Sequence, residues 1–167
     1  KIDKATLRKA RFEDTFSQMG VDPQLFPTAF EEEYLAICPT KTNLFPHAYE
    51  TLDYLKDKYA LHLISNGFKE ACEKKLTHSK LYPYFETVVI SEIVGYNKPN
   101  PLIFEYALNN GNCAKEQAIM IGDNIDADVR GAQNFGMDAI YFNAIGQQKP
   151  QDIQHMIVDL KDLQNFF

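Results

Sequence analysis

The sequence is poor in cysteine and in long apolar runs, and both shortages narrow what the protein can be. Its three cysteines, Cys38, Cys72 and Cys113, are scattered and form no CxxC pair. An odd, dispersed set cannot close a full disulfide framework, so we expect a reducing, cytoplasmic setting. The four histidines are isolated as well, which argues against a zinc site. No apolar stretch approaches the roughly 18 residues of a membrane span, so no membrane partner is expected.

Positive charge is also scarce, because 17 Lys and Arg stand against 23 Asp and Glu, giving a net charge of −6. The phosphate backbone of a nucleic acid needs clustered Lys and Arg, so we expect no nucleic-acid partner. A small phosphorylated metabolite needs only a local positive site and is not excluded. The 167 residues are enough for one domain or a small domain with a subdomain. Hydrophobic residues make up 45% of the chain, so a core can form.

The apolar pattern changes near residue 42. Before it, residues 3–37 predict two amphipathic helices, whose aromatic side chains we interpret as packing between the helices. The stretch CPTKTNLFPH is a hinge-like break. The chain opens with KIDKATLRK, without an initiator Met, so we expect it to be the interior of a longer protein.

Beyond the break, short apolar runs alternate with helical patterns. Strands are predicted at 61–65, 87–91, 118–122, 138–142 and 156–159. Helices are predicted at 46–58, 69–78, 101–109 and 126–135. This alternation predicts an α/β fold, a Rossmann-like parallel sheet with helices on both faces.

Two polar clusters follow predicted strands, where ligands bind in open parallel sheets. In ISNGF, Ser65 ends a strand, and Asn66 and Gly67 turn the chain into a helix, so a hydroxyl and N–H groups can converge on an anion. In GYNKPNP, Lys98 precedes a helix start, where its charge can neutralise a phosphoryl group and a nearby carboxylate. Each cluster alone is equally typical of an ordinary turn or of a surface lysine.

A third cluster crowds three aspartates into IMIGDNIDADVRGA. Asp123 follows a strand directly, and Asp128, near the next helix start, can bind metal-bound water or steer Lys98. We interpret Asp126 as the cap of that helix. Hard oxygen ligands without His or Cys suit Mg²⁺. An EF-hand loop beginning at Asp126 is excluded, because Met137 occupies the twelfth position, where a Glu is needed.

The order of these clusters on an alternating strand–helix pattern resembles the haloacid dehalogenase superfamily of phosphohydrolases. LISNG looks like its second motif, GYNKPNP its third and IGDNIDAD its fourth, over about residues 46–143. The resemblance implies residues 1–42 as part of a helical cap and 43–167 as the Rossmann-like hydrolase core. LFPHAYETLDYL, SNGF and GDNIDADVRGAQNFGMDAIYFN look most like the pyrimidine 5′-nucleotidase branch.

The resemblance also implies roles for individual residues. Ser65, Lys98 and Asp128 would be catalytic, and Mg²⁺ would be held by Asp123 and Asp128. Phosphate would be bound by Ser65, Asn66, Gly67 and Lys98. The implied reaction of the complete enzyme is Mg²⁺-dependent hydrolysis of a phosphate monoester.

The family's first motif, D-x-D-x-T/V at the end of a central first strand, is missing from this chain. Its first Asp is the family's nucleophile, and the D-x-D found here, Asp126 to Asp128, lies inside the fourth motif. The resemblance therefore implies a nucleophile upstream of this chain, a sheet without its central strand, and a polypeptide that is inactive alone. Either the missing N-terminal segment or another chain would supply the strand.

Other functions stay open at this point. The chain fits an inactive fragment or a module that binds phosphate or a partner, as well as a haloacid dehalogenase. Dehalogenases work without metal and tend to lack the Gly-Asp pair found at Asp123, which favours the phosphatase. Receiver domains use similar residues, but their acidic pair precedes the Thr/Ser and Lys, whereas here the acidic cluster comes last.

Overall fold

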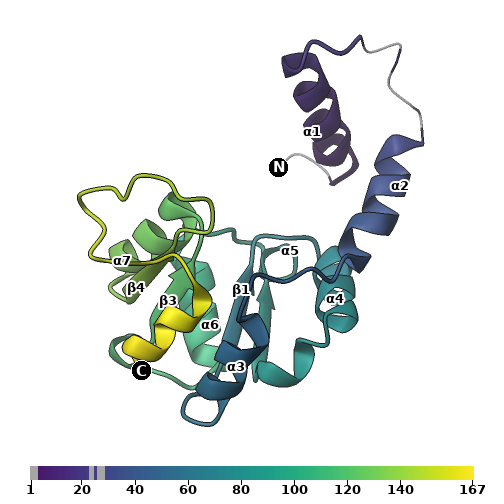
Figure 1. Cartoon of the computed structure of the whole chain (residues 1–167). Coiled ribbons are helices and arrows are strands. Elements are labelled where there is room, and N and C mark those ends of the chain that lie inside the picture. The colour runs from purple at the N-terminus through teal and green to yellow at the C-terminus, as the bar shows by residue number, and fades with distance from the viewer. Residues whose placement is uncertain (1–3, 23–24, 26–28) are drawn as a thin grey trace. The chain divides into compact units, whose positions relative to one another are not determined.

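The computed structural model describes residues 4–22, 25 and 29–167 and divides the chain into two compact units, Lys1–Lys41 and Thr42–Phe167. The smaller unit contains the helices α1 (Lys4–Gln18) and α2 (Phe30–Ile37), followed by a short 3₁₀ turn, η2 (Cys38–Thr40) (Figure 1). No helix in the described ranges is long and apolar enough to cross a membrane.

Aromatic rings hold α1 and α2 together. Phe12 is 8% exposed and meets Phe30 and Tyr34 edge-on, with ring centroids 5.6 and 5.2 Å apart. Phe16 meets Phe30 in the same way at 5.3 Å. Such edge-to-face pairs add about 0.5–1.5 kcal/mol each beyond the area they bury. The predicted packing of aromatic residues between these helices is confirmed.

The larger unit alternates strands and helices as the sequence predicted (Figure 1). Its strands are β1 (His62–Ser65), β2 (Thr87–Ile90), β3 (Ile119–Gly122), β4 (Asp138–Phe142) and β5 (His155–Ile157). Its α-helices are α3 (Ala48–Lys56), α4 (Lys69–His78), α5 (Ser91–Val94), α6 (Pro101–Asn110) and α7 (Gly131–Phe135). Short 3₁₀ turns are η3 (Tyr82–Tyr84), η4 (Lys115–Gln117) and η6 (Leu160–Asn165), and η5 (Ile125–Arg130) is a π-helical turn.

All strand pairs are parallel and form two sheets, one of β1–β2 and one of β3–β4–β5. Ser65 pairs with Ile90 and Gly122 pairs with Tyr141, so the polar clusters begin where their strands end. Within the described part of the chain, no strand pairs with the second edge of β1 or of β3. The α/β fold with parallel strands is confirmed, and both of these strands are sheet edges.

Alternate residues of each strand are buried under different helices. In β4, Ile140 and Phe142 pack with Leu55 of α3 and Leu163 of η6. Ala139 and Tyr141, on the opposite face, join a cluster with α6 and α7. Burial on both faces explains why these strands are continuous apolar runs rather than alternating patterns.

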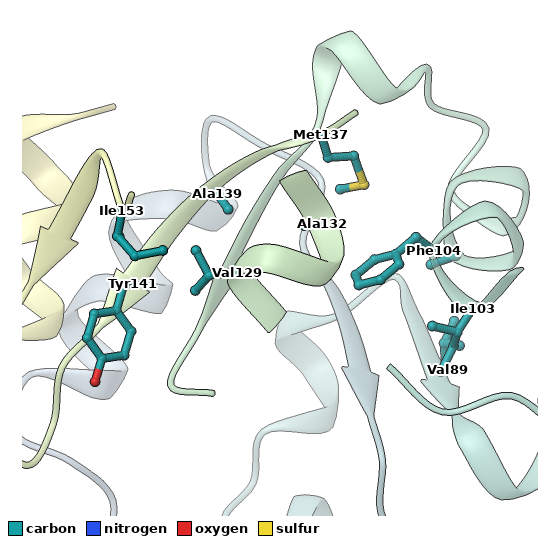
Figure 2. Packing of buried hydrophobic residues seen from close by; sticks show 10 residues of the cluster. Val89, Ile103, Phe104, Val129, Ala132, Met137, Ala139, Tyr141 and Ile153 are labelled. Carbon is teal, nitrogen blue, oxygen red and sulfur yellow. The ribbon is translucent and has the colours of Figure 1, made fainter. Parts of the chain in front are cut away.

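The central cluster connects the two sheets. Ile103 and Phe104 of α6 are fully buried and belong to one cluster with Val89 of β2, Val129 of η5 and Tyr141 of β4 (Figure 2). Each such side chain stabilises the fold by roughly 1.5–3 kcal/mol through burial. On the other face of β1–β2, side chains of α4 pack against both strands. Helices therefore cover both faces, as predicted.

Helix α6 begins as its sequence predicted. The side-chain oxygen of Asn100 accepts a hydrogen bond from the Leu102 N–H at 3.0 Å, and Pro101 occupies the first turn. This start fixes the chain just after Lys98, which places the lysine at a defined point of the larger unit.

Candidate active site

The turn after β1 is organised by Ser65. The Gly67 N–H donates to Ser65 Oγ at 3.1 Å, and a Cβ at Gly67 would lie 3.0 Å from the same oxygen. A side chain at this position would crowd the hydroxyl, so glycine lets the backbone approach it closely. Cys72, one turn into α4, is buried, and burial raises the pKa of its thiol, while a hydrogen bond with Ser65 acts in the opposite direction.

Lys98 and Asp128 form a buried ion pair. Lys98 Nζ lies 2.7 Å from Asp128 Oδ1, and their side chains are 9% and 6% exposed. The same ammonium donates to the Ile64 carbonyl at 2.8 Å, at the end of β1. Lys98 thus connects the carboxyl end of β1 with the segment that follows β3. Asp128 and Lys98 are therefore in direct contact, and the steering of Lys98 by Asp128 stays a prediction.

Asn66 is bound to the backbone of Lys98. Its side-chain oxygen accepts from the Lys98 N–H at 2.7 Å, and its side-chain N–H donates to the Lys98 carbonyl at 2.9 Å. The two residues are 32 positions apart in sequence. This pair of hydrogen bonds joins the turn after β1 to the loop between α5 and α6.

The second oxygen of Asp128 is also occupied. Asp128 Oδ2 accepts from the Asn124 N–H at 3.0 Å. A Cβ at Gly122 would collide with the Asp128 carboxyl group. Asp128 therefore folds back over the end of β3, where only a residue without a side chain leaves room for it.

Asp126 is not the helix cap, which corrects the sequence interpretation. Asn124 caps this turn instead, because its side-chain oxygen accepts from the Ala127 N–H at 2.8 Å. Asp126 lies inside η5 and pairs with Arg130 Nη1 at 2.7 Å. Arg130 also binds Asp152 through Nε at 2.7 Å and Nη2 at 3.0 Å. This bidentate pair lowers the pKa of Asp152 and raises that of Arg130.

Asp123 is exposed and lines a surface cavity. It borders a cavity of about 300 Å³ formed by the segment after β3 and the loop between β4 and β5. This lining consists of Asp123, Asn124, Ile125, Asp126, Tyr141, Phe142, Ala144, Ile145 and Gln147. Lys98 and Ser65 are not part of it.

The described residues do not form a complete metal-binding group by themselves. Among them, no three His, Cys, Asp or Glu side chains lie close enough together to hold a metal ion. Asp128 is engaged by Lys98 and by the Asn124 N–H, which leaves Asp123 as the exposed carboxylate at the end of β3. A single carboxylate is compatible with Mg²⁺, which keeps several waters and commonly takes one or two protein carboxylates plus substrate phosphate.

Some of the predicted site residues are in direct contact with one another, and others are linked only through a neighbouring residue. Lys98, Asp128 and Asn66 are joined by direct hydrogen bonds or ion pairs, and Ser65 adjoins them along β1. Asp123 is connected through its neighbour Asn124, whose N–H binds Asp128. The catalytic, phosphate-binding and metal-binding roles of these residues stay predictions.

Sequence reasoning missed three parts of this arrangement. The cap at Asn124 had a readable signal, since Asn two positions before a helical pattern is a common start. The Asn66 side-chain contact and the Arg130–Asp152 pair had none, because both join residues distant in sequence.

Comparison with known proteins identifies the family. The haloacid dehalogenase-like hydrolase family matches residues 3–142. This chain belongs to that family. The resemblance found in its motifs is confirmed, and the relatives include nucleotidases and phosphatases.

Over 153 residues the chain is 32% identical to the pyrimidine 5′-nucleotidase YjjG of Escherichia coli (strain K12), covering 91% of this chain and 66% of the relative. Over 101 residues it is 42% identical to the glyceraldehyde 3-phosphate phosphatase of Methanothermobacter thermautotrophicus, covering 60% and 45%. The chain thus spans about half to two thirds of the length of these relatives.

The fold is shared with the HAD-hydrolase YfnB of Bacillus subtilis, solved bound to magnesium. The TM-score is 0.84 at 23% identity, over 99% of this chain and 72% of that one. At this level of identity the likeness shows the common fold.

Proposed function

We propose that this chain is the C-terminal part of a Mg²⁺-dependent phosphate monoester hydrolase that acts through an aspartyl-phosphate. The nucleophilic aspartate would lie upstream of Lys1, in a segment that completes the sheet between β1 and β3. Membership of a hydrolase family and a chain shorter than its relatives support this proposal. The described residues would supply the groups that bind the phosphate and stabilise its negative charge.

The buried Lys98–Asp128 pair, 2.7 Å between Nζ and Oδ1, is the observation that carries the proposal. A lysine ammonium has three N–H donors, and two of them bind Ile64 and Asp128. The third can donate to a phosphoryl oxygen. Because Asp128 and the β1 carbonyl fix the ammonium, it need not reorganise when charge develops on phosphorus.

The turn after β1 would orient the phosphate. The Ser65 hydroxyl accepts from Gly67, and its own proton can rotate from Cys72 towards an anion. The N–H groups of this turn lie just before the N-terminus of α4, where the helix dipole favours negative charge. Ser65, Asn66, Gly67 and Lys98 would together hold the phosphoryl oxygens.

In the proposed reaction, the upstream carboxylate forms a bond to phosphorus as the bond to the leaving oxygen breaks, and water then hydrolyses the acyl phosphate. Lys98 stabilises negative charge on the phosphoryl oxygens in both steps, and Asp128 keeps Lys98 in place. Asp123 would be the carboxylate of this chain that holds Mg²⁺. When bound, Mg²⁺ supplies positive charge to the phosphate oxygens.

A small phosphorylated metabolite is the proposed substrate, with pyrimidine nucleoside 5′-monophosphates as the first class to test. The relative YjjG, named a pyrimidine 5′-nucleotidase, is 32% identical over 153 residues. The second relative, named a glyceraldehyde 3-phosphate phosphatase, is 42% identical over a shorter stretch of 101 residues. Sugar phosphates therefore form the comparison class. A cytoplasmic location, and a cap role for residues 1–42, are further parts of the proposal.

Phosphatase assays with p-nitrophenyl phosphate and Mg²⁺ test this function. We expect no activity from residues 1–167 and clear activity from a polypeptide extended upstream through a D-x-D-x-T/V motif. In the extended form, Asp123→Ala should abolish Mg²⁺-dependent turnover, whereas Asp138→Ala, a control at the exposed start of β4, should not.

Three results would overturn the proposal. Turnover by residues 1–167 would show that no upstream nucleophile is required. An extended form that binds phosphate but never turns over would favour the binding module. Metal-independent release of halide from a 2-haloacid by the extended form would instead show a dehalogenase.

A further inference from the structure

We propose that the side chain of Asn66 is a positioning residue that sets the place of Lys98, in addition to the phosphate contact expected from its N–H. The inference rests on the proposed function for its catalytic consequence. Its structural part concerns this chain alone and is tested separately.

The contact uses both polar atoms of the amide. Asn66 accepts from the Lys98 N–H at 2.7 Å and donates to the Lys98 carbonyl at 2.9 Å. Within the described contacts, both main-chain groups of Lys98 thus pair with one side chain. The peptide groups on either side of the Lys98 Cα are held from the turn after β1.

Lys98 is therefore held at two ends. Its ammonium binds the Ile64 carbonyl and Asp128, and its backbone binds Asn66. Ile64 and Asn66 flank Ser65, so the two neighbours of the serine fix the lysine relative to it. This closed set of contacts aligns the hydroxyl and the ammonium that the phosphate would meet.

Asn66 matters because the residues just before Lys98 are little buried. Residues 95–97 are exposed, and the next contacts along the loop are the hydrogen bond from the Asn100 N–H to the Asn97 carbonyl at 2.8 Å and the packing of Pro99 near Gly131. A lysine with a flexible backbone can keep its ion pair while its third N–H swings away. A displacement of about 1 Å is enough to cost catalysis on the order of a hundredfold.

The chemistry selects an amide of this length. An aspartate keeps the acceptor, lacks the donor, and adds negative charge where a phosphate would bind. Glutamine carries the same amide one methylene farther out. We therefore expect Asn66→Gln to restore part of the lysine geometry and Asn66→Ala to restore none.

The structural arm uses residues 1–167 and nuclear magnetic resonance. In wild type, the Lys98 ammonium is buried and hydrogen-bonded, so its protons should exchange slowly with solvent and give a ¹⁵N signal. The chemical shift of the Lys98 amide proton should show the effect of its hydrogen bond to Asn66. Asn66→Ala should remove the amide shift and speed ammonium exchange at least tenfold. The matched control is Asn110→Ala, which also removes a side-chain donor to a backbone carbonyl, at the far end of α6.

The catalytic arm uses the upstream-extended enzyme with p-nitrophenyl phosphate. Asn66→Ala should lower kcat at least tenfold with KM changed less than threefold, and Asn66→Gln should recover part of kcat. Asn110→Ala should match wild type. Equal thermal unfolding of the Asn66 and Asn110 variants shows that the loss is not one of folding.

The outcomes separate the two proposals. Unchanged Lys98 signals in Asn66→Ala overturn the positioning role, whatever the enzyme does. Altered signals with unchanged kcat overturn its catalytic importance. Altered signals in an extended protein that has no phosphatase activity support the positioning contact and reject the proposed function instead.

Discussion

At the scale of single residues, the structure explains most clearly why position 122 is a glycine. A Cβ there would collide with the Asp128 carboxyl group, so Gly122→Ala must push Asp128 away from Lys98 and from the Asn124 N–H. Overpacking of this kind costs about 1–3 kcal/mol. We expect urea unfolding to show that loss, together with faster exchange of the Lys98 ammonium.

A background without the Asp128 side chain checks the cause. In Asp128→Gly, which has already lost the colliding carboxyl group and the ion pair, Gly122→Ala should cost little further stability. If Gly122→Ala costs as much in that background as in wild type, the collision is not the reason for the loss.

The ion pair between Lys98 and Asp128 gives a second residue-scale prediction. Asp128→Leu leaves a buried ammonium without its partner, and breaking a buried pair in this way costs about 3–5 kcal/mol. The double variant Lys98→Met/Asp128→Leu removes both charges and should unfold at a urea concentration close to that of wild type. A double-mutant cycle measures the coupling, and additive losses would contradict it.

At the scale of elements, the sequence predicted the strands well, and the reason is burial. Strands β2, β3 and β4 lie between helices on two faces, so their apolar runs were strong signals. The helix expected at 126–135 was found as two parts, because its first turn is π-helical. Neither hydrophobic periodicity nor helix propensity distinguishes a π-helical turn from an α-helical one. In this turn the Asn124 side chain caps the start and Asp128 binds the Asn124 N–H.

The candidate site was predicted residue by residue and, among its contacts, only the one between Asp128 and Lys98 was expected. Motif order indicated Lys98 and Asp128, and the structure joins them. The exposed position of Asp123 beside a cavity on the β4 side depends on how two loops fold. Long-range loop contacts leave no periodic trace in a sequence, so this part was beyond prediction.

The loop between β4 and β5 provides an element-scale prediction. The Arg130 guanidinium holds the pKa of Asp152 below its ordinary value. A depressed carboxyl pKa stabilises the folded state above the unfolded-state value, about 3.9, and that contribution disappears as pH falls through the folded value. Asp152→Asn should therefore lower Tm at pH 7.

Thermal scans from pH 7 to 2 measure this effect. The Tm difference between wild type and Asp152→Asn should shrink below about pH 4. Asp138→Asn, which alters an exposed carboxylate at the start of β4, should follow wild type throughout. A difference that is constant with pH would mean that the Arg130–Asp152 pair contributes through packing alone.

At the scale of the whole molecule, family and fold were readable from three ordered motifs, while the roles of the two units were not. The helices of Lys1–Lys41 pack through aromatic rings, which is equally typical of a cap and of any helical hairpin. Substrate choice in the proposed enzyme would depend on surfaces outside the proposed phosphate-binding residues. Assays across nucleotides and sugar phosphates are needed to assign it.

The unpaired edges of β1 and β3 support one prediction for the complete protein. Each strand has a partner on one side within the described residues, and an edge strand presents a row of N–H and C=O groups that another strand can pair with. If an upstream segment inserts there, amides of 62–65 and 119–122 should exchange with solvent more slowly in the extended protein. Amides of β4, already paired on both sides, should change less. Hydrogen-exchange mass spectrometry of the two forms measures both sets, and equal slowing in all three strands would indicate general stabilisation rather than insertion between β1 and β3.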